Sequence, residues 1–318
     1  MAMTWTDQSG YLTNNQLNKQ FQKVAQPLMR FRQFVKIKEA FGKHKGETVN
    51  WLKVSNISTI GGKLVETETM PIAAASFSWG TLTVNEYGNA IAWTRKMEDL
   101  SEFDILDIFR ENLLDDFVKV MDGAVEREFN KTPLRYVGTA TDGGVLTTDG
   151  TATATNNSPL NAYHVRQIVD ELRKRNVPPF EDGSYVCIAS VEAMSNLRSS
   201  LESVFQYTET GYKRLLNGEV GKYAGVRFVE DTFATRYTYD ADNRTTTAKS
   251  WTNGKSLEAY FFGRPTVREA VAVPEMIIKD NPKDFGRSRA LAWYFVGGWA
   301  IEWDDEPNAR IIKWDSAA

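Results

Sequence analysis

The longest regular spacing of apolar residues lies in residues 101–131 and predicts one long helix. Its apolar stripe recurs at steps of three and four: Leu106, Phe109, Leu113, Phe117, Val120 and Ala124. Ser101 is expected to cap the N-terminus, with Asp104 completing a weak capping box. Pro133 ends the helix because proline cannot continue it. Gly123 is interpreted as a bend or a close-packing point, with a break into two helices as the alternative.

The length of this helix predicts the shape of the molecule. At roughly 1.5 Å per residue it would be about 45 Å long, whereas a compact globule of this chain length is about 50 Å across. The helix would therefore cross almost the whole molecule, which favours a flat, elongated subunit with a spine.

An alternation of period two precedes the helix and predicts a β-hairpin. Residues 48–54 and 75–84 both alternate, and Phe77 and Trp79 share a face. Turn-forming residues lie between them, namely Gly61, Gly62 and Pro71. Such a ribbon would reach about 40 Å, and a two-stranded ribbon is marginal alone in water. It needs a partner surface on its own domain or on another subunit, and residues 86–94 then return the chain to the body.

The segment after the helix is predicted to build an α/β layer. Residues 137–157 are rich in Gly and Thr and are expected to form a loop or surface flap. Ser158 and Pro159 predict the start of a helix that runs to about Arg175. A strand at 184–189 and a helix capped by Ser190 follow, and this strand–helix order is typical of an α/β layer.

The last third of the chain is predicted to be mostly strands. Gly218, Gly221 and Gly225 punctuate a turn before a strand at 226–230, and residues 232–256 resemble a polar surface insertion. Strands are expected at 257–262 and 267–273. Residues 291–303 and 309–314 are predicted to form a hairpin around residues 304–308, with Gly297 and Gly298 permitting a bend or bulge.

Composition places the chain among ordinary globular proteins. It has 318 residues, 42% hydrophobic and 25% charged. It contains no long apolar run that would span a membrane and no recognisable signal peptide. Its single cysteine, Cys187, lies in an apolar strand and is interpreted as a buried, inert thiol. We therefore expect cytoplasmic synthesis.

Charge is unevenly distributed. The net charge is −3, but residues 18–46 oppose one acid, Glu39, with eight cations: Lys19, Lys23, Arg30, Arg32, Lys36, Lys38, Lys43 and Lys45. The predicted long helix is acidic. A basic N-terminal arm at residues 1–46 suggests an anionic partner or docking on an acidic surface of a neighbour, with a solvated helix face as the alternative. Nine tryptophans point to subunit contacts or to a Trp-rich core.

Motifs for catalysis, cofactors and metals are not found in the sequence. There is no phosphate-binding loop and no nucleophile elbow, and the glycines near 218–225 precede a strand rather than a helix. The two histidines, His44 and His164, are far apart in the sequence and without clustered cysteines. Asp240 begins a run that only partly resembles a calcium loop and is interpreted as a turn. We expect no catalytic, cofactor-binding or metal-binding residue.

The order of these parts resembles the HK97-like fold of tailed-bacteriophage major capsid proteins, and most of all the N-four-type phage capsids. The resemblance implies an α+β fold with an N-arm at 1–46 and an extended E-loop hairpin at 47–94. It also implies a P-domain at 95–176 with its spine helix at 101–131, an A-domain at about 177–275, and a C-terminal return to the P-domain at 276–318. Some family members crosslink Lys to Asn between subunits, for which Lys63 and Asn308 are the right residue types.

This resemblance implies a structural protein rather than an enzyme. Copies would assemble into hexamers and pentamers of an icosahedral head in the virion, formed in the host cytoplasm around double-stranded DNA. Trp51, Lys63, Phe77 and Trp79 are the candidate interface residues. Further candidate partners are scaffold, portal and decoration proteins, with no membrane and no cofactor.

Two other functions are weighed against the capsid. An encapsulin-like compartment would keep the fold and enclose protein cargo. A carbohydrate-active enzyme or binding protein would suit the Trp content but needs paired carboxylates in a cleft. The only acids flanked by Trp are Glu302 and Asp304, in a segment that looks structural.

Overall fold

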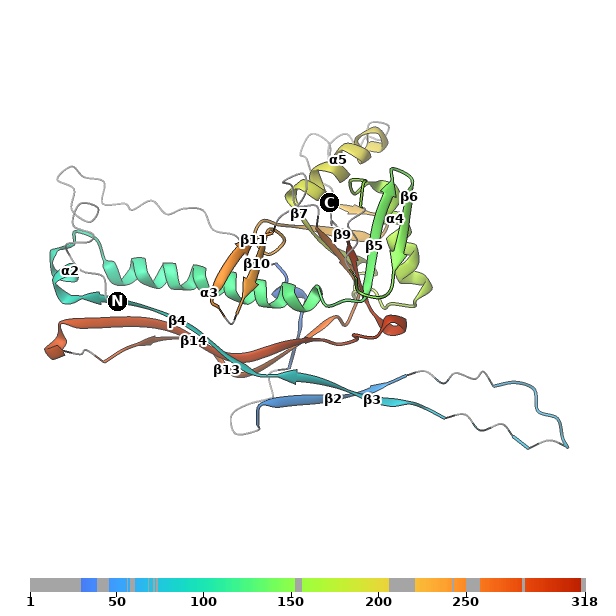
Figure 1. Cartoon of the computed structure of the whole chain (residues 1–318), viewed down its shortest axis with the longest axis horizontal. Coiled ribbons are helices and arrows are strands. Elements are labelled where there is room, and N and C mark those ends of the chain that lie inside the picture. The colour runs from blue at the N-terminus through green and yellow to red at the C-terminus, as the bar shows by residue number, and fades with distance from the viewer. Residues whose placement is uncertain are drawn as a thin grey trace.

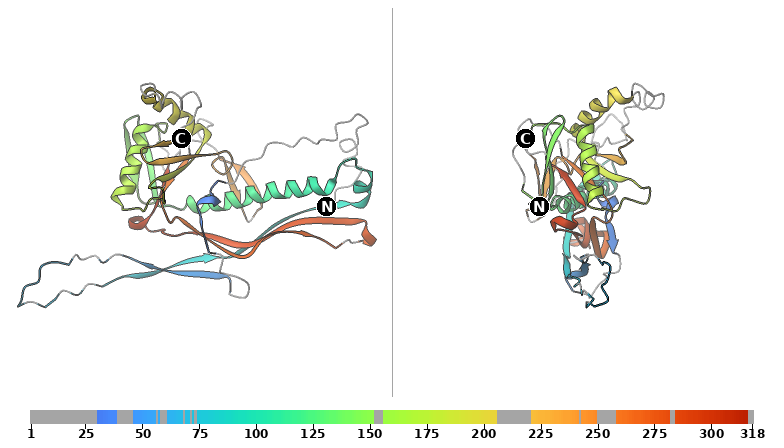
Figure 2. Two further views of the ribbon diagram at one scale, coloured as in Figure 1. Left: turned by 180° about the vertical axis from the view of Figure 1, so that it is seen from behind. Right: turned by 90° about the vertical axis from the view of Figure 1, so that its right-hand side faces the viewer.

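A long helix lies along an elongated molecule and joins two β-sheets (Figure 1). The computed structural model describes residues 30–38, 46–55, 57, 61–67, 69–70, 72, 74–151, 156–205, 221–241, 243–249, 258–281 and 284–315. Seen from its end the molecule is narrow (Figure 2). The α+β fold and the elongated shape with a spine are confirmed.

The spine is helix α3, Ile105–Phe129, and it begins one turn later than predicted. Asp104 is its N-cap, because its Oδ1 accepts the backbone N–H groups of Leu106 and Asp107 at 3.0 and 3.3 Å. Ser101 instead follows the short helix α2, Arg95–Leu100, and its hydroxyl bonds to Phe103. The helix has 25 residues, which gives a length of about 37 Å.

Gly123 does not break the helix. A Cβ at this position would lie 2.8 Å from the Cβ of Tyr239, so the close-packing interpretation is confirmed. Tyr239 belongs to β10, Tyr237–Asp240, which pairs with β11, Thr245–Ala248. The predicted polar surface insertion at residues 232–256 thus contains a mostly exposed hairpin, which differs from the prediction only in burying Tyr239 against α3.

A four-stranded sheet packs along α3 in the order β1-β13-β14-β4. Its strands are β1 (Lys36–Lys38), β13 (Val267–Lys279), β14 (Ser288–Ile301) and β4 (Asn85–Thr94). Residues 85–94 thus form a strand of the body, paired with β14, and only β2 (Thr48–Val54) and β3 (Phe77–Thr83) make the projecting hairpin. Aromatic side chains fill the core, with Phe117 against Trp293 and Phe295.

The glycine pair at 297–298 fits the predicted irregularity. The register of β13 on β14 shifts between Val271 and Val273, opposite Gly297. A Cβ on Gly298 would lie 2.2 Å from the carbonyl oxygen of Thr83. This glycine therefore lets the base of the β2–β3 hairpin approach the sheet.

The second sheet has seven strands, in the order β6-β5-β15-β12-β7-β9-β8. These are β6 (Gly143–Thr147), β5 (Leu134–Ala140), β15 (Ile311–Trp314), β12 (Ala259–Phe262), β7 (Tyr185–Ser190), β9 (Val226–Asp231) and β8 (Lys222–Tyr223). Alternate residues divide between two cores. Cys187 and Phe261 face helices α4 (Ala162–Lys174) and α5 (Val191–Phe205), whereas Val186 and Phe262 belong to the core around α3.

The sequence predicts a loop or surface flap at residues 137–157, but this segment contains the end of β5 and all of β6, which pair in the seven-stranded sheet. Their small residues leave room for aromatic rings, since a Cβ on Gly138 would meet Trp314 and one on Gly144 would meet Tyr136. Helix α4 also starts later than predicted. Asn161, not Ser158, is its N-cap and accepts two backbone N–H groups.

The predicted terminal hairpin is wrong as well. Strand β14 pairs with β13 and β4, and β15 pairs with β12 and β5 in the other sheet. The turn at 304–308 therefore carries the chain from one sheet to the other. The structure therefore does not divide at the expected segments 95–176 and 276–318. From these segments β5, β6 and β15 join the seven-stranded sheet, and α4 packs on it.

The Gly298→Ala variant tests the close approach of the hairpin to the sheet. Its methyl group has to displace backbone, so we expect the free energy of unfolding to fall by about 1–3 kcal/mol. Urea denaturation of the full-length chain measures this. Gly62→Ala is the control, because its Cβ would meet nothing within 4 Å; equal stability of the two variants would contradict the packing.

Candidate assembly surface

The hairpin β2–β3 has one face turned toward its own body. Val49, Trp51 and Leu82 are buried there with Val84 and Ala270. The guanidinium carbon of Arg268 lies 5.1 Å from the centre of the Trp51 ring. Trp51 is only 7% exposed, so the prediction that it contacts a neighbouring subunit is not supported: it anchors the hairpin within its own chain.

The opposite face of the hairpin is apolar and open to solvent. It consists of two cross-strand pairs, Leu52 opposite Trp79 and Val54 opposite Phe77. These side chains are 50%, 69%, 50% and 64% exposed respectively. We call these four residues the ribbon patch. Because monomeric proteins rarely expose contiguous large apolar side chains, the ribbon patch has the character of an interaction surface.

The ribbon patch lies on a segment that leaves the body. The hairpin extends beyond the end of the four-stranded sheet (Figures 1 and 2), and Lys63 is exposed in its distal part. On the inner face, between Leu52 and Val54, Lys53 ties the ribbon to its own body, since its Nζ lies 2.6 Å from an Asp304 carboxylate oxygen. This hydrogen bond lowers the pKa of Asp304. This part of the hairpin therefore has an inner face fixed to its own body and an apolar outer face that is open to solvent.

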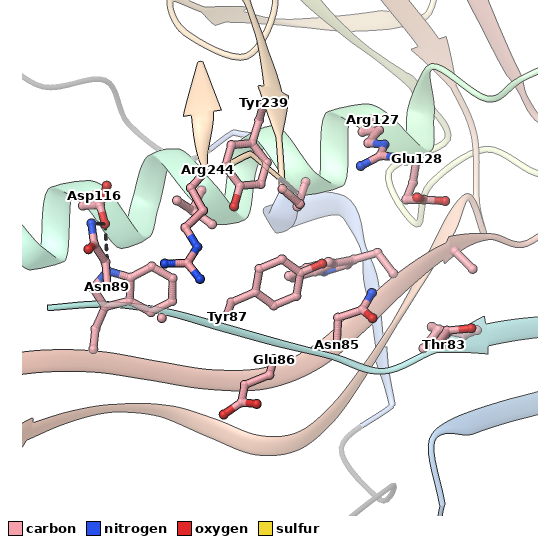
Figure 3. Close-up of a pocket in the computed structure, with 18 of the residues that line it drawn as sticks. Thr83, Asn85, Glu86, Tyr87, Asn89, Asp116, Arg127, Glu128, Tyr239 and Arg244 are labelled. Carbon is pink, nitrogen blue, oxygen red and sulfur yellow. Dashed lines mark hydrogen bonds between the residues drawn. The ribbon is translucent and has the colours of Figure 1, made fainter. Parts of the chain in front are cut away.

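A polar groove of about 700 Å³ lies beside the hairpin base, between α3, β4 and the β10–β11 turn. In Figure 3 the Arg244 side chain points into it from that turn, across from Tyr87. Asp116 on α3 accepts hydrogen bonds from Asn89 and Trp293, both at 2.9 Å. The lining carries both signs of charge, with Glu86, Asp116 and Glu128 beside Arg127, Lys131 and Arg244, so the groove is polar without a preference for one sign of charge.

In the described part of the basic arm, Arg32 forms an ion pair within its own chain. Arg32 forms an ion pair with Glu269 at 2.8 Å, with Glu269 fully buried, and its guanidinium lies 5.5 Å from the Phe295 ring centre. Arg30 is partly buried, Lys36 is exposed, and Lys38 belongs to β1. Lys19, Lys23, Lys43 and Lys45, like Gly218, lie outside the described residues.

A buried ionic network was not anticipated from the sequence. Glu126 on α3 lies 2.8 Å from Lys249, Lys249 lies 2.7 Å from Glu258, and Glu258 lies 3.1 Å from Lys313 on β15. Tyr260 donates its hydroxyl to Glu126. Burial raises the pKa of Glu126, whereas Lys313 and Lys249 outweigh burial and lower that of Glu258. The network joins the spine helix to the seven-stranded sheet, and the acidic composition of the helix is the one sequence feature that pointed toward it.

The remaining candidate residues take structural positions. Cys187 is buried, and burial raises the pKa of its thiol well above the usual value. Asp240 accepts hydrogen bonds from Asn243 within a turn. Asn308 bonds to Asp305 in the turn that follows β14, so a link between Lys63 and Asn308 stays a prediction. Within the described ranges, no group of three or more His, Cys, Asp and Glu side chains could hold a metal, and no helix is long and apolar enough to cross a bilayer.

The sequence matches no family model and no curated protein. The fold, by contrast, is similar along nearly the whole chain to solved structures of phages and of a GTA particle. The capsid of the cyanophage P-SCSP1u has a TM-score of 0.69 at 10% identity, covering 97% of this chain and 94% of that one. A Mycobacterium phage Che8 chain has a TM-score of 0.67 at 13% identity, with coverage of 96% and 98%. The capsid of a native GTA particle has 0.62 at 14%, with 98% of both chains. The chain therefore has the HK97-like fold of phage capsid proteins.

The Arg32→Ala variant tests whether this arm cation serves the fold. Removing it strands the buried Glu269, so we expect a loss of about 3 kcal/mol in the free energy of unfolding at neutral pH. Lys36→Ala, which removes an exposed cation four residues away, is expected to change it by less than about 0.5 kcal/mol. Denaturation of both variants in parallel gives the comparison. A loss for Arg32→Ala as small as that for Lys36→Ala would show that the subunit does not depend on the Arg32 ion pair for its stability.

Proposed function

We propose that this chain is the major capsid protein of a tailed bacteriophage, a structural protein without enzymatic activity. Copies assemble into hexamers and pentamers of an icosahedral head. The observation that carries the proposal is the ribbon patch on a hairpin that leaves its own body, in a chain with the fold of phage capsid proteins. The finer assignment to the N-four-type capsids rests on the order and lengths of the parts.

The ribbon patch supplies the driving force for assembly. Fully burying a large apolar side chain contributes about 1.5–3 kcal/mol, and four such side chains stand half or more exposed in a single copy. A surface on a neighbouring copy that covers them differs from the ribbon itself, so the contact is heterologous and repeats around a ring until it closes. This explains why a hairpin that is marginal by itself is retained.

The remaining partners are proposed from charge and from the fold. The arm cations that are not consumed by internal ion pairs, such as exposed Lys36, are proposed to contact packaged double-stranded DNA, without sequence preference and with strong salt dependence. Scaffold, portal and decoration proteins are proposed as further partners. The location follows: assembly in the host cytoplasm and residence in the virion.

The double variant Phe77→Ser/Trp79→Ser tests the role of the ribbon patch. Both side chains are exposed in one copy, so the free energy of unfolding should change by less than about 0.5 kcal/mol for each. Loss of about 3 kcal/mol per contact would raise the concentration needed for assembly by more than about hundredfold. Size-exclusion chromatography and negative-stain microscopy over a concentration series measure this.

Val145→Ser is the matched control, because Val145 is a 55% exposed strand residue on the seven-stranded unit. Normal particles from the double variant would contradict the role of the ribbon patch. Wild-type particles that contain protein cargo and no DNA would identify an encapsulin-like compartment instead of a phage head.

A further inference from the structure

One lysine of the buried ionic network also touches a side-chain amide. Lys313 on β15 is 6% exposed, and its Nζ lies 2.8 Å from Oδ1 of Asn130, the residue that ends helix α3. The same Nζ lies 3.1 Å from Oε1 of Glu258, whose side chain is also buried. An amine, an amide and a carboxylate therefore meet where the spine helix reaches the seven-stranded sheet.

The surroundings of the Lys313 amine keep water away from it. The centre of the Tyr260 ring lies 5.4 Å from Nζ, and the flanking residues Ile312 and Trp314 are fully buried. Loss of water favours the neutral amine over the ammonium ion, which is how a buried lysine becomes a nucleophile. Asn130 is partly exposed, so a small molecule released from its amide can pass into solvent.

Glu258 is placed to take a proton from Lys313. Its other oxygen, Oε2, lies 2.7 Å from Lys249, which also pairs with Glu126 at 2.8 Å. Burial acts to lower the pKa of Lys249, but attraction to these two carboxylates outweighs burial and raises it. Lys249 therefore keeps its proton, and Lys313 is the amine of the network that lies against an amide.

The ion pair of Lys313 with Glu258 is the resting state. Burial acts to raise the pKa of Glu258, but Lys313 and Lys249 outweigh burial and lower it. Transfer of a proton from Lys313 to Glu258 gives a neutral amine and a neutral acid as a minor form. A reaction that proceeds through this minor form is slow, so its extent increases with the age of the protein.

We propose that Lys313 and Asn130 form an intramolecular isopeptide bond, with Glu258 as the proton carrier. All three groups belong to one chain, so the bond needs no second copy. It would join the end of the spine helix covalently to β15 of the seven-stranded sheet. The bond goes beyond the proposed function, because it forms whether or not the chain builds a head.

The reaction balances without an oxidant or a cofactor. Glu258 first takes one proton from the Lys313 ammonium group. Nζ then attacks Cγ of Asn130, so that an Nζ–Cγ bond forms and the Cγ–Nδ2 bond breaks. A second proton of Nζ moves to Nδ2, which leaves as ammonia, and Glu258 returns its proton to the ammonia, which departs as ammonium. The contact between amine and amide supplies the proximity that makes such a step effectively unimolecular.

Mass spectrometry of the full-length denatured protein tests the bond, after incubation at neutral pH until the mass is constant. We expect the chain to be lighter than its sequence by one ammonia molecule. Trypsin should give a branched peptide that joins the segments containing Asn130 and Lys313, without cleavage after Lys313. A chain of full sequence mass would overturn the proposal. Loss of ammonia without a branched peptide would also overturn it, since that result marks a cyclic imide at an asparagine.

Two variants separate the amine from the proton carrier. Lys313→Arg keeps a cation beside Glu258, but a guanidinium group does not give up its proton in a protein, so the branched peptide should be absent. Glu258→Gln keeps both reacting groups and removes the proton carrier, so the bond should form about a hundredfold more slowly. A wild-type rate in Glu258→Gln would overturn the role of Glu258.

Lys131→Arg is the matched control. Lys131 is next to Asn130 in the sequence, but its side chain is 54% exposed and pairs with Glu128 at 2.6 Å. This variant should form the bond at the wild-type rate. A branched peptide that persists in Lys313→Arg, or that disappears in Lys131→Arg, would overturn the assignment to Lys313.

Discussion

The packing of α3 between two sheets is the constraint on which this structure depends. The first half of the helix packs Phe109 and Phe117 against aromatic residues of β4 and β14 in the four-stranded sheet. Its last turns meet the seven-stranded sheet through Phe129 and the buried Glu126. Without this helix the two sheets would share little core. Its straightness through Gly123 keeps the two units at a fixed separation, and the hairpin and the arm are both positioned relative to it.

The hairpin follows a different logic from the body. Trp51 and Lys53 hold its inner face against its own chain by packing and by an ion pair. The side chains of the ribbon patch are half or more exposed. A two-stranded ribbon gains its stability from what covers it. Because the inner face is packed on its own chain and the outer face is not, a stable subunit can keep an exposed apolar surface for a partner.

Periodicity predicts the elements of this fold better than their partners. The sequence predicts three of these elements because each depends on residues close in sequence. They are the spine helix α3, the strands β2 and β3, and the helix after Ser190. The partners of β14 and of β15 could not be predicted. Strands adjacent in sequence favour a hairpin, but β14 pairs with β13 and β15 pairs with β12, each in a different sheet. Trp51 was misassigned because alternation does not say which face is covered. Glu126 and Glu258 were missed because charge normally marks a surface.

The short strand β1 has a consequence for the sheet it joins. It lies in parallel along β13, with Lys36 to Lys38 opposite Arg268 to Ala270, and it occupies the outer margin of the four-stranded sheet. An edge strand without a neighbour presents unpaired N–H and C=O groups, with which another extended chain can pair. Displacement of the arm would expose the backbone N–H and C=O groups of β13 that now pair with β1. At Arg268 to Ala270 the arm therefore occupies an edge of the sheet that would otherwise be open to strand addition.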